Sequence, residues 1–188
     1  MKPALFEDEY YLRCISLARL SKGQGERYGS LLVKDGHTIG MGYNRAIAHP
    51  SFHLERLIRM GQVNHAEIEA MNDALKVCDD LEGSDIYCAG YFPKPDDKFQ
   101  KPNHLMIRSG AYYTCFLCLP HMRKYKISSI CVPTEIGWAQ MTLDQASASA
   151  ELFRDNRHEM RRKIVSTSYT LDDIAGSLVD LESIQKTL

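Results

Sequence analysis

Two short motifs contain the side chains best suited to hold a metal ion and to move protons. His65 and Glu67 stand close together in a His-Ala-Glu motif, and Cys115 and Cys118 form a Cys-x-x-Cys motif further along the chain. One imidazole and two thiolates can bind zinc in a tetrahedral site whose fourth position stays open to water. Zinc in such a site brings the pKa of its bound water to about 7, and we expect Glu67 to shuttle protons without being a ligand.

Each motif has a simpler interpretation when it is taken alone. A Cys-x-x-Cys motif can be a redox pair or a chance occurrence, and His-x-Glu can be an ordinary solvated helix start. Together the two motifs could still form a structural zinc clip. An open fourth position separates the two kinds of zinc site, because structural sites are closed by four protein ligands.

Apolar periodicity predicts the helices and strands that must position these motifs. The ranges with helical spacing are 8–20, 64–78, 114–126, 143–164 and 170–184. The ranges typical of short strands are 28–33, 38–43, 85–91 and 127–132, the last of them closed by Pro133. A turn containing Asp35-Gly36 joins the first two strands and suits an antiparallel hairpin. The alternation of strands and helices predicts layers of helices on a mixed sheet.

Both motifs are expected at the starts of helices. Residues three apart in the first helical turn share a face, so Cys115 and Cys118 can grip one ion. Thr114 can act as the N-cap of that helix. At the far end of the chain, Thr170 and Asp173 are spaced for a capping box. The metal site therefore requires two helix starts, far apart in the sequence, to meet.

Length and composition limit the class of protein. The chain has 188 residues, 44% hydrophobic and 25% charged, with a formal net charge of -1. These values suit one globular domain and give no overall charge bias toward nucleic acid or membranes. No apolar run approaches the length of a membrane span, and the N-terminal residues lack the pattern of a secretory signal. We therefore expect a cytoplasmic protein whose six cysteines are reduced and serve as core residues or metal ligands.

Two further features have weaker interpretations. His49 and His53 are four positions apart and could bind a second, structural metal, but without a nearby cysteine pair a surface or loop role is favoured. The basic stretches 123–126 and 154–163 could contact nucleic acid. Interleaved acidic and apolar residues in these stretches favour solvated helix faces.

The sequence resembles the cytidine and deoxycytidylate deaminase superfamily, which also includes tRNA adenosine deaminases and guanine deaminases. The resemblance covers about Tyr28 to Pro133. The matching motifs, in the order of that family, are Tyr-Gly-Ser-Leu-Leu-Val-Lys-Asp-Gly at 28–36, Gly-Met-Gly-Tyr-Asn at 40–44, His-Ala-Glu-Ile-Glu-Ala at 65–70 and the Cys-x-x-Cys. The His-x-Glu and Cys-x-x-Cys order is the signature of zinc nucleobase deaminases.

This resemblance implies a fold, a cofactor and site residues. The implied fold is a three-layer α/β/α domain with a central five-stranded mixed sheet, and members are usually oligomers, so we expect a homo-oligomer. Zn²⁺ is the implied cofactor. Asn44, Ala66 and Thr114 are the implied substrate-binding residues, although the family usually has proline where this chain has Thr114.

Two segments depart from the compact members of the superfamily. The loop 92–109 is longer than its counterpart there, and the tail after Trp138 has no clear counterpart. Either segment could form a lid or a subunit contact. We predict a deaminase domain over residues 1–140, with residues 141–188 as a helical extension packed on the same domain.

The favoured hypothesis is a hydrolytic deaminase that releases ammonia from a nucleobase in a free nucleoside or nucleotide, of the cytidine or deoxycytidylate type. A near-neutral charge favours such a small substrate over RNA. The alternatives are a tRNA adenosine deaminase, suggested by Asn-Arg-Ala-Ile at 44–47, and a guanine deaminase. A zinc-stabilised scaffold protein without activity is the alternative of another class. Glu67 argues against a scaffold, because a structural site gains nothing from that carboxylate.

Overall fold

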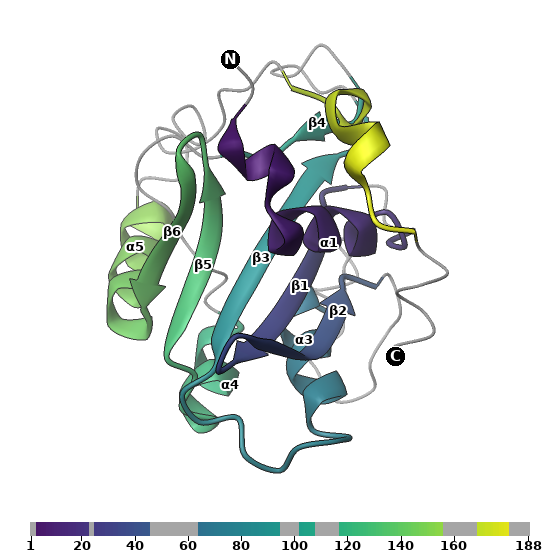
Figure 1. Ribbon diagram of the computed structural model, residues 1–188. Helices are drawn as coiled ribbons and strands as arrows, with labels where there is room; N and C mark the ends of the chain where they lie inside the picture. Colours follow the sequence, from purple (N-terminus) through teal and green to yellow (C-terminus); the bar gives the residue numbers. More distant parts are fainter. Residues whose placement is uncertain are drawn as a thin grey trace.

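A mixed β-sheet lies at the centre of the computed structural model, with helices on both faces (Figure 1). The structure describes residues 3–22, 25–45, 64–94, 102–107, 117–155 and 169–180. The elements in chain order are η1 (Ala4–Glu7), α1 (Glu9–Ala18), β1 (Arg27–Lys34), β2 (His37–Tyr43), α3 (Ala66–Ala74), β3 (Asp85–Phe92), β4 (His104–Leu105), α4 (Leu119–Lys124), β5 (Ser129–Thr134), β6 (Gly137–Thr142), α5 (Leu143–Asp155) and η2 (Leu171–Ser177).

The strands follow the order β2-β1-β3-β5-β6, and the two-residue β4 pairs with the end of β3. Only β3 and β5 pair in parallel among the described strands, and the other pairs are antiparallel. The sheet thus has the five expected strands in one path, with β4 as a sixth. The expected three-layer α/β/α arrangement with a mixed sheet is confirmed.

The hairpin β1–β2 follows from its turn. Asp35 and Gly36 both have positive φ, 51° and 78°, as a tight turn between right-twisted strands requires. The tyrosine hydroxyl of Tyr10 on α1 donates to the carbonyl of Gly36 at 3.0 Å. The hairpin predicted from Asp-Gly is therefore confirmed.

Side chains of successive strand residues point to opposite faces of the sheet, and this divides the hydrophobic core into two clusters. Leu31 and Val33 of β1 pack with α1, η1 and η2 on one face of the sheet. Leu32, one position away, packs with residues of α3, α4 and α5 on the other face. Successive strand residues point to opposite faces, so a run that is buried on both sides must be apolar throughout. Figure 1 shows α1 and η2 in front of the sheet and α3, α4 and α5 behind it.

The prediction that Pro133 closes the last strand is wrong. β5 continues through Pro133 to Thr134. After a turn at Glu135 and Ile136 the chain returns as β6, whose first residue, Gly137, has a φ of 132°. Proline lacks the N–H that a central strand donates. Here it is tolerated because the pairing of β5 with β3 extends only to Cys131, so Pro133 pairs with β6 alone.

The third predicted helix begins later than expected. The structure has α4 starting at Leu119, with Cys118 as its N-cap instead of a first-turn residue. Pro120 explains the difference, because proline suits the first turn of a helix and breaks the interior of one. The predicted start at Thr114 lies outside the described residues, as do residues 156–164 of the next predicted helix.

The tail forms a shorter and tighter element than the helix predicted over 170–184. η2 is a 3-10 helix opened by the predicted capping box of Thr170 and Asp173, and the chain is extended again at Leu178. Val179 donates its backbone N–H to Oγ of Ser16 at 3.1 Å, which draws the chain away from a helical path. Residues 181–184 lie outside the described part of the chain.

The tail also joins the long segment that follows β3. The backbone N–H of Leu105 donates to the carbonyl of Tyr169 at 2.9 Å, and that of Leu171 donates to Asn103 at 3.0 Å. The segment predicted as the loop 92–109 therefore contains β4, held between β3 and the tail. The predicted division at residue 140 stays a prediction. Among the described residues, no helix has both the length and the apolar character of a membrane span.

Candidate metal centre

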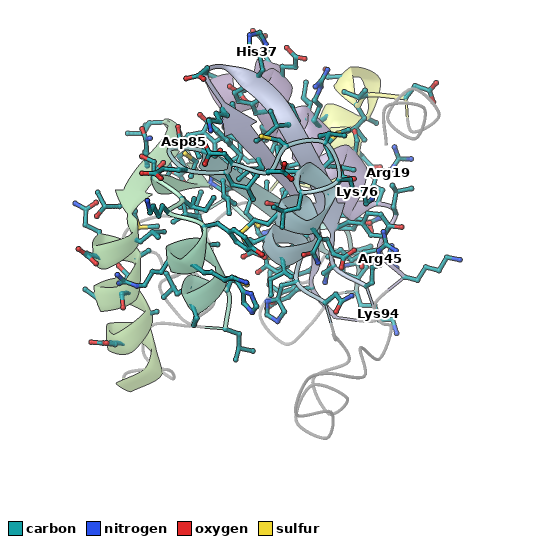
Figure 2. All side chains as sticks on the ribbon, turned by 90° about the horizontal axis from the view of Figure 1, so that it is seen from below. Arg19, His37, Arg45, Lys76, Asp85 and Lys94 are labelled. Carbon is teal, nitrogen blue, oxygen red and sulfur yellow. The ribbon has the colours of Figure 1, made fainter. Side chains whose placement is uncertain are left out.

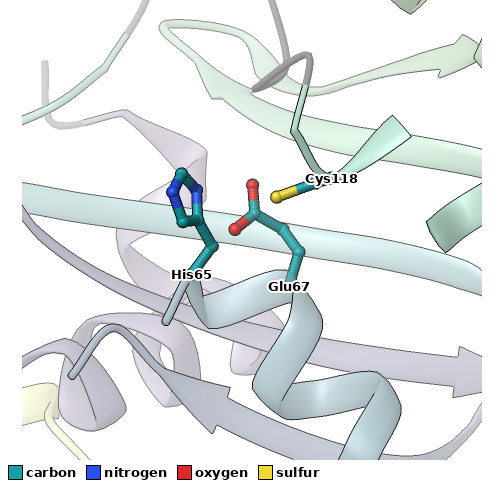
Figure 3. A group of neighbouring side chains, drawn as sticks. All are labelled: His65, Glu67 and Cys118. Carbon is teal, nitrogen blue, oxygen red and sulfur yellow. The ribbon is translucent and has the colours of Figure 1, made fainter. Parts of the chain in front are cut away.

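Three side chains from two helix starts meet behind the sheet. The donor atoms of His65, Glu67 and Cys118 all lie within 4.8 Å of one another. Figure 3 shows the carboxylate of Glu67 between the imidazole of His65 and Sγ of Cys118. His65 is the N-cap of α3, Glu67 lies in its first turn and Cys118 precedes α4. The two helix starts that the sequence required to meet are therefore in contact.

The donor set fits a zinc ion. Zinc accepts imidazole nitrogen, thiolate sulfur and carboxylate oxygen as ligands. Cys118 is fully buried, Glu67 is 8% exposed and His65 is partly buried. Ionised acidic side chains in such a setting need a compensating positive charge or hydrogen bonds. A divalent cation would supply that charge, so the group is able to hold a metal.

The prediction also names residues outside the described part of the chain. Cys115 and Thr114 lie outside the described residues, as do His49 and His53 of the possible second metal site. Two roles are compatible with the described geometry of Glu67: a third ligand beside His65 and Cys118, and the proton carrier beside an ion that Cys115 also holds.

Asn44 stands at the end of β2 and is 2% exposed. Its Oδ1 accepts the backbone N–H of Tyr28 at 2.8 Å, and its Nδ2 donates to the carbonyl of Glu26 at 2.9 Å. The side chain therefore links the end of β2 to the start of β1. The role of Asn44 in substrate binding stays a prediction that these contacts do not test.

Ala66 begins α3, where the helix approaches the sheet closely. A Cβ on Gly42 of β2 would lie 2.5 Å from the carbonyl oxygen of Ala66 and 2.4 Å from the backbone nitrogen of Ala70. On the same strand, the backbone N–H of Met41 donates to Oδ2 of Asp73 at 3.0 Å. Glycine on the strand and alanine on the helix thus let α3 lie against β2 and fix where His65 stands.

Sequence reasoning missed a set of polar residues around His65. Glu69 accepts a hydrogen bond from Nδ2 of Asn64 at 3.0 Å and forms an ion pair with Nε of Arg45 at 3.2 Å. Arg45 in turn lies over the ring of Tyr43, 5.0 Å from the centroid. Figure 2 shows Arg45 on the opposite side of the molecule from Asp85. Glu69 lies inside the His-Ala-Glu-Ile-Glu-Ala motif, but its ion-pair partner Arg45 is too distant in the sequence to be recognised from it.

Comparison with known proteins identifies the family. The pattern of the family described as "Cytidine and deoxycytidylate deaminase zinc-binding region" matches residues 6–134, and the chain belongs to this family. Zinc is thus the metal of the family, and the group of His65, Glu67 and Cys118 lies within the match. No curated protein matches the sequence.

Three solved structures are similar to the chain at low identity. A dCMP deaminase from the cyanophage S-TIM5, in complex with dCMP and dUMP, is 19% identical with a TM-score of 0.33, over 56% of this chain and 63% of that one. A diaminohydroxyphosphoribosylaminopyrimidine deaminase/5-amino-6-(5-phosphoribosylamino)uracil reductase from Thermotoga maritima is 20% identical with a TM-score of 0.39, over 78% and 34%. RibD from Acinetobacter baumannii is 16% identical with a TM-score of 0.36, over 80% and 33%. This chain therefore spans less than two thirds of the phage enzyme and about a third of the other two.

Proposed function

We propose that the chain is a zinc-dependent hydrolytic deaminase that acts on the base of a free nucleoside or nucleotide, of the cytidine or deoxycytidylate type. The observation that carries the proposal is the meeting of His65, Glu67 and Cys118 at two helix starts, in a chain that belongs to a zinc-binding deaminase family. A carboxylate in a group that already offers imidazole and thiol donors supports hydrolysis over a purely structural role.

His65, Cys118 and Cys115 would hold the zinc, which supplies a nucleophile by lowering the pKa of a water molecule in the open position. Glu67 accepts the proton of the attacking water as the oxygen adds to the ring carbon that bears the amine. The Glu67 carboxyl then gives this proton to the ring nitrogen. The carboxylate next takes the remaining proton from the hydroxyl now bound to the ring carbon and delivers it to the amine. The carbon–nitrogen bond breaks, ammonia leaves and the ring carbon becomes a carbonyl.

Substrate contacts form a second part of the proposal. Asn44 uses Oδ1 and one N–H of its amide in the contacts described above, and an amide has two N–H donors. We assign the other N–H to the substrate. Ala66 and Thr114 complete the proposed pocket. A homo-oligomer in the cytoplasm, with residues 141–188 as an extension of the domain, remains our expectation.

The proposal is tested with Glu67→Gln, a change that keeps the size of the side chain and removes its ability to carry protons. We expect this variant to retain zinc and to lose activity by about 100-fold or more. The measurements are ammonia release from a panel of cytidine, deoxycytidylate, guanine and adenosine-containing tRNA, and the zinc content of each protein. Glu151→Gln on the exposed face of α5 is the matched control and should match the wild type.

The same measurements also test the alternatives: Glu67 as a zinc ligand, a scaffold protein without activity, and a tRNA deaminase. Loss of zinc from Glu67→Gln, with zinc retained in Cys115→Ser, would make Glu67 a ligand and contradict the shuttle. A zinc-loaded wild type that releases no ammonia from any member of the panel would favour the scaffold protein. Salt-sensitive binding of tRNA together with deamination of its adenosine would replace the small substrate by RNA.

A further inference from the structure

We propose that Glu69 is a positioning residue for the metal centre, which fixes the backbone before His65 to the end of β2. This inference rests on the proposed function in one respect, namely that His65 is a metal ligand. It concerns how tightly the ion is held, which is a property separate from turnover.

The Glu69 carboxylate lies between two chain segments. Oε1 accepts from Nδ2 of Asn64 at 3.0 Å, and Oε2 pairs with Nε of Arg45 at 3.2 Å. The two partners are themselves joined through the backbone. The N–H of Arg45 donates to the carbonyl of Asn64 at 3.1 Å, and the N–H of Asn64 donates back at 3.4 Å. The side chain of Glu69 thus contacts both residues, Arg45 and Asn64, of an isolated antiparallel β-bridge.

The backbone of His65 is fixed by the start of α3. As the N-cap of α3 it has extended torsion angles, φ -83° and ψ 148°, and its side chain does not cap the helix. The carbonyl of an N-cap residue accepts the first hydrogen bond of its helix. This bond is donated by the N–H of Glu69 to the carbonyl of His65 at 3.1 Å. Glu69 consequently holds His65 from the helix side and Asn64 from the strand side.

The ion pair of Glu69 and Arg45 is partly buried. The Glu69 side chain is 16% exposed and that of Arg45 is 43% exposed, so the pair lies at the boundary between core and solvent. A Cβ on Gly42 would lie 2.7 Å from Cβ of Glu69, which shows how closely the helix start and the strand approach. Arg45 is also packed over Tyr43, which limits its freedom to leave the pair. The link is therefore local and well packed.

Outer residues that orient a metal ligand commonly change metal affinity by about 10–100-fold when they are replaced. We expect Glu69→Ala to accelerate zinc release and to weaken zinc affinity within that range. Glu69→Gln keeps an acceptor for Asn64 and loses the charge that pairs with Arg45, so it should fall between Glu69→Ala and the wild type. Asn64→Ala should add little in the Glu69→Ala background, because the two residues act through one contact.

The experiment uses the full chain loaded with one zinc ion, a chromogenic chelator to follow release, and the Tm of each metal-free protein. Glu9→Ala is the matched control, because it also removes a glutamate from a first helical turn where it pairs with an arginine, Arg13, at 3.0 Å. We expect the two metal-free variants to have similar Tm values, with rapid zinc release from Glu69→Ala alone. Equal release from both variants, or faster release explained entirely by a lower Tm, would overturn the inference.

Failure of the inference and failure of the proposed function give different results. If His65→Ala loses zinc and Glu69→Ala does not, only the positioning role is wrong. If both variants lose zinc and the wild type deaminates nothing, the positioning role stands and the proposed activity is wrong. A wild type that binds no zinc contradicts both.

Discussion

At the scale of single residues, the cysteines occupy contrasting surroundings. Cys118 lies beside a histidine and a carboxylate, whereas Cys14 is part of α1 and Cys131 is part of β5, away from the metal group. Burial raises the pKa of the Cys14 thiol well above its usual range. Burial also raises the pKa of Cys131 from 9.0 to about 11, against a smaller lowering by the Ser129 hydroxyl. These two thiols stay neutral at physiological pH and serve as core residues.

Alkylation should separate the described cysteines by reactivity. The thiolate is the nucleophile, so a buried thiol with a raised pKa reacts slowly. We expect iodoacetamide at pH 8 to modify Cys78, which is only partly buried, well before Cys14 and Cys131. Peptide mass spectrometry over a time course measures the order. Rapid modification of Cys131 in the folded protein at pH 8 would contradict its placement in the sheet.

The raised pKa of Cys131 also fixes the sign of its effect on stability. Below pH 9 the thiol is neutral in both the folded and the unfolded chain, and its full contribution is present. Between pH 9 and about 11 the unfolded chain ionises first. The contribution of this residue to the free energy of unfolding is therefore lost as the pH rises through that window.

At the scale of elements, the contact of α3 with β2 sets the position of the candidate site. Gly40 and Gly42 face the helix, and a Cβ at either would lie within 2.5 Å of helix backbone atoms. Backbone atoms cannot move aside as a flexible side chain does. The absence of two side chains on the strand thus determines how close His65 and Glu67 come to the sheet.

A single methyl group at this contact should disturb both stability and metal binding. We expect Gly42→Ala to lower the free energy of unfolding by about 1–3 kcal/mol, because α3 must shift away from β2. Gly176→Ala in η2 is the control, since a Cβ there meets no atom within 4 Å, and it should change stability by less than about 0.5 kcal/mol. Urea denaturation of the two variants measures the difference. Equal stability of both would show that the contact is looser than described.

Local signals in the sequence predict some of these elements and not others. The hairpin was predictable because Asp35-Gly36 supplies the positive φ angles, and α3 because its apolar residues recur at helical spacing. β6 was missed because its residues are mostly part-exposed and its pairing depends on a turn beyond Pro133. The tail was expected as a helix because its spacing is helical, but its contacts with α1 exist only in the folded chain.

Part of the candidate site could likewise be predicted from the sequence, and part could not. The meeting of His65, Glu67 and Cys118 could be expected, because each motif has its own spacing and its own helix start. The link through Glu69 could not be expected. Arg45 and Asn64 are far apart in the sequence and become neighbours only when the end of β2 pairs with the residue before α3.

At the scale of the whole molecule, the tail completes the core on the α1 face. Ile174 of η2 is 2% exposed and belongs to the same cluster as Leu5, Phe6 and Ile15. The rings of Phe6 and Tyr169 meet edge to face, with centroids 5.0 Å apart. The segment 169–180 therefore belongs to the layer formed by η1 and α1, as Figure 1 shows for η2.

Replacing one apolar side chain of the tail with alanine should measure how much the tail contributes to the free energy of unfolding. We expect Ile174→Ala to lower the free energy of unfolding by about 2–5 kcal/mol, the usual cost of a cavity left by a large apolar residue. Asp172→Ala on the exposed side of the same element is the control and should have little effect. Denaturant unfolding gives the values, and hydrogen exchange at the Leu105 amide reports whether β4 is released. A cost no greater than that of Asp172→Ala would contradict the packing.

The contact between Val179 and Ser16 joins positions 163 residues apart. A ribosome makes the chain from its N-terminus, so α1 emerges long before the segment that covers it. Until residues 169–180 have been synthesised, the apolar side of α1 cannot complete its native packing and stays open to other apolar surfaces in the cell. Docking of the tail is therefore a late step of folding during synthesis, and it is the step that covers this side of α1.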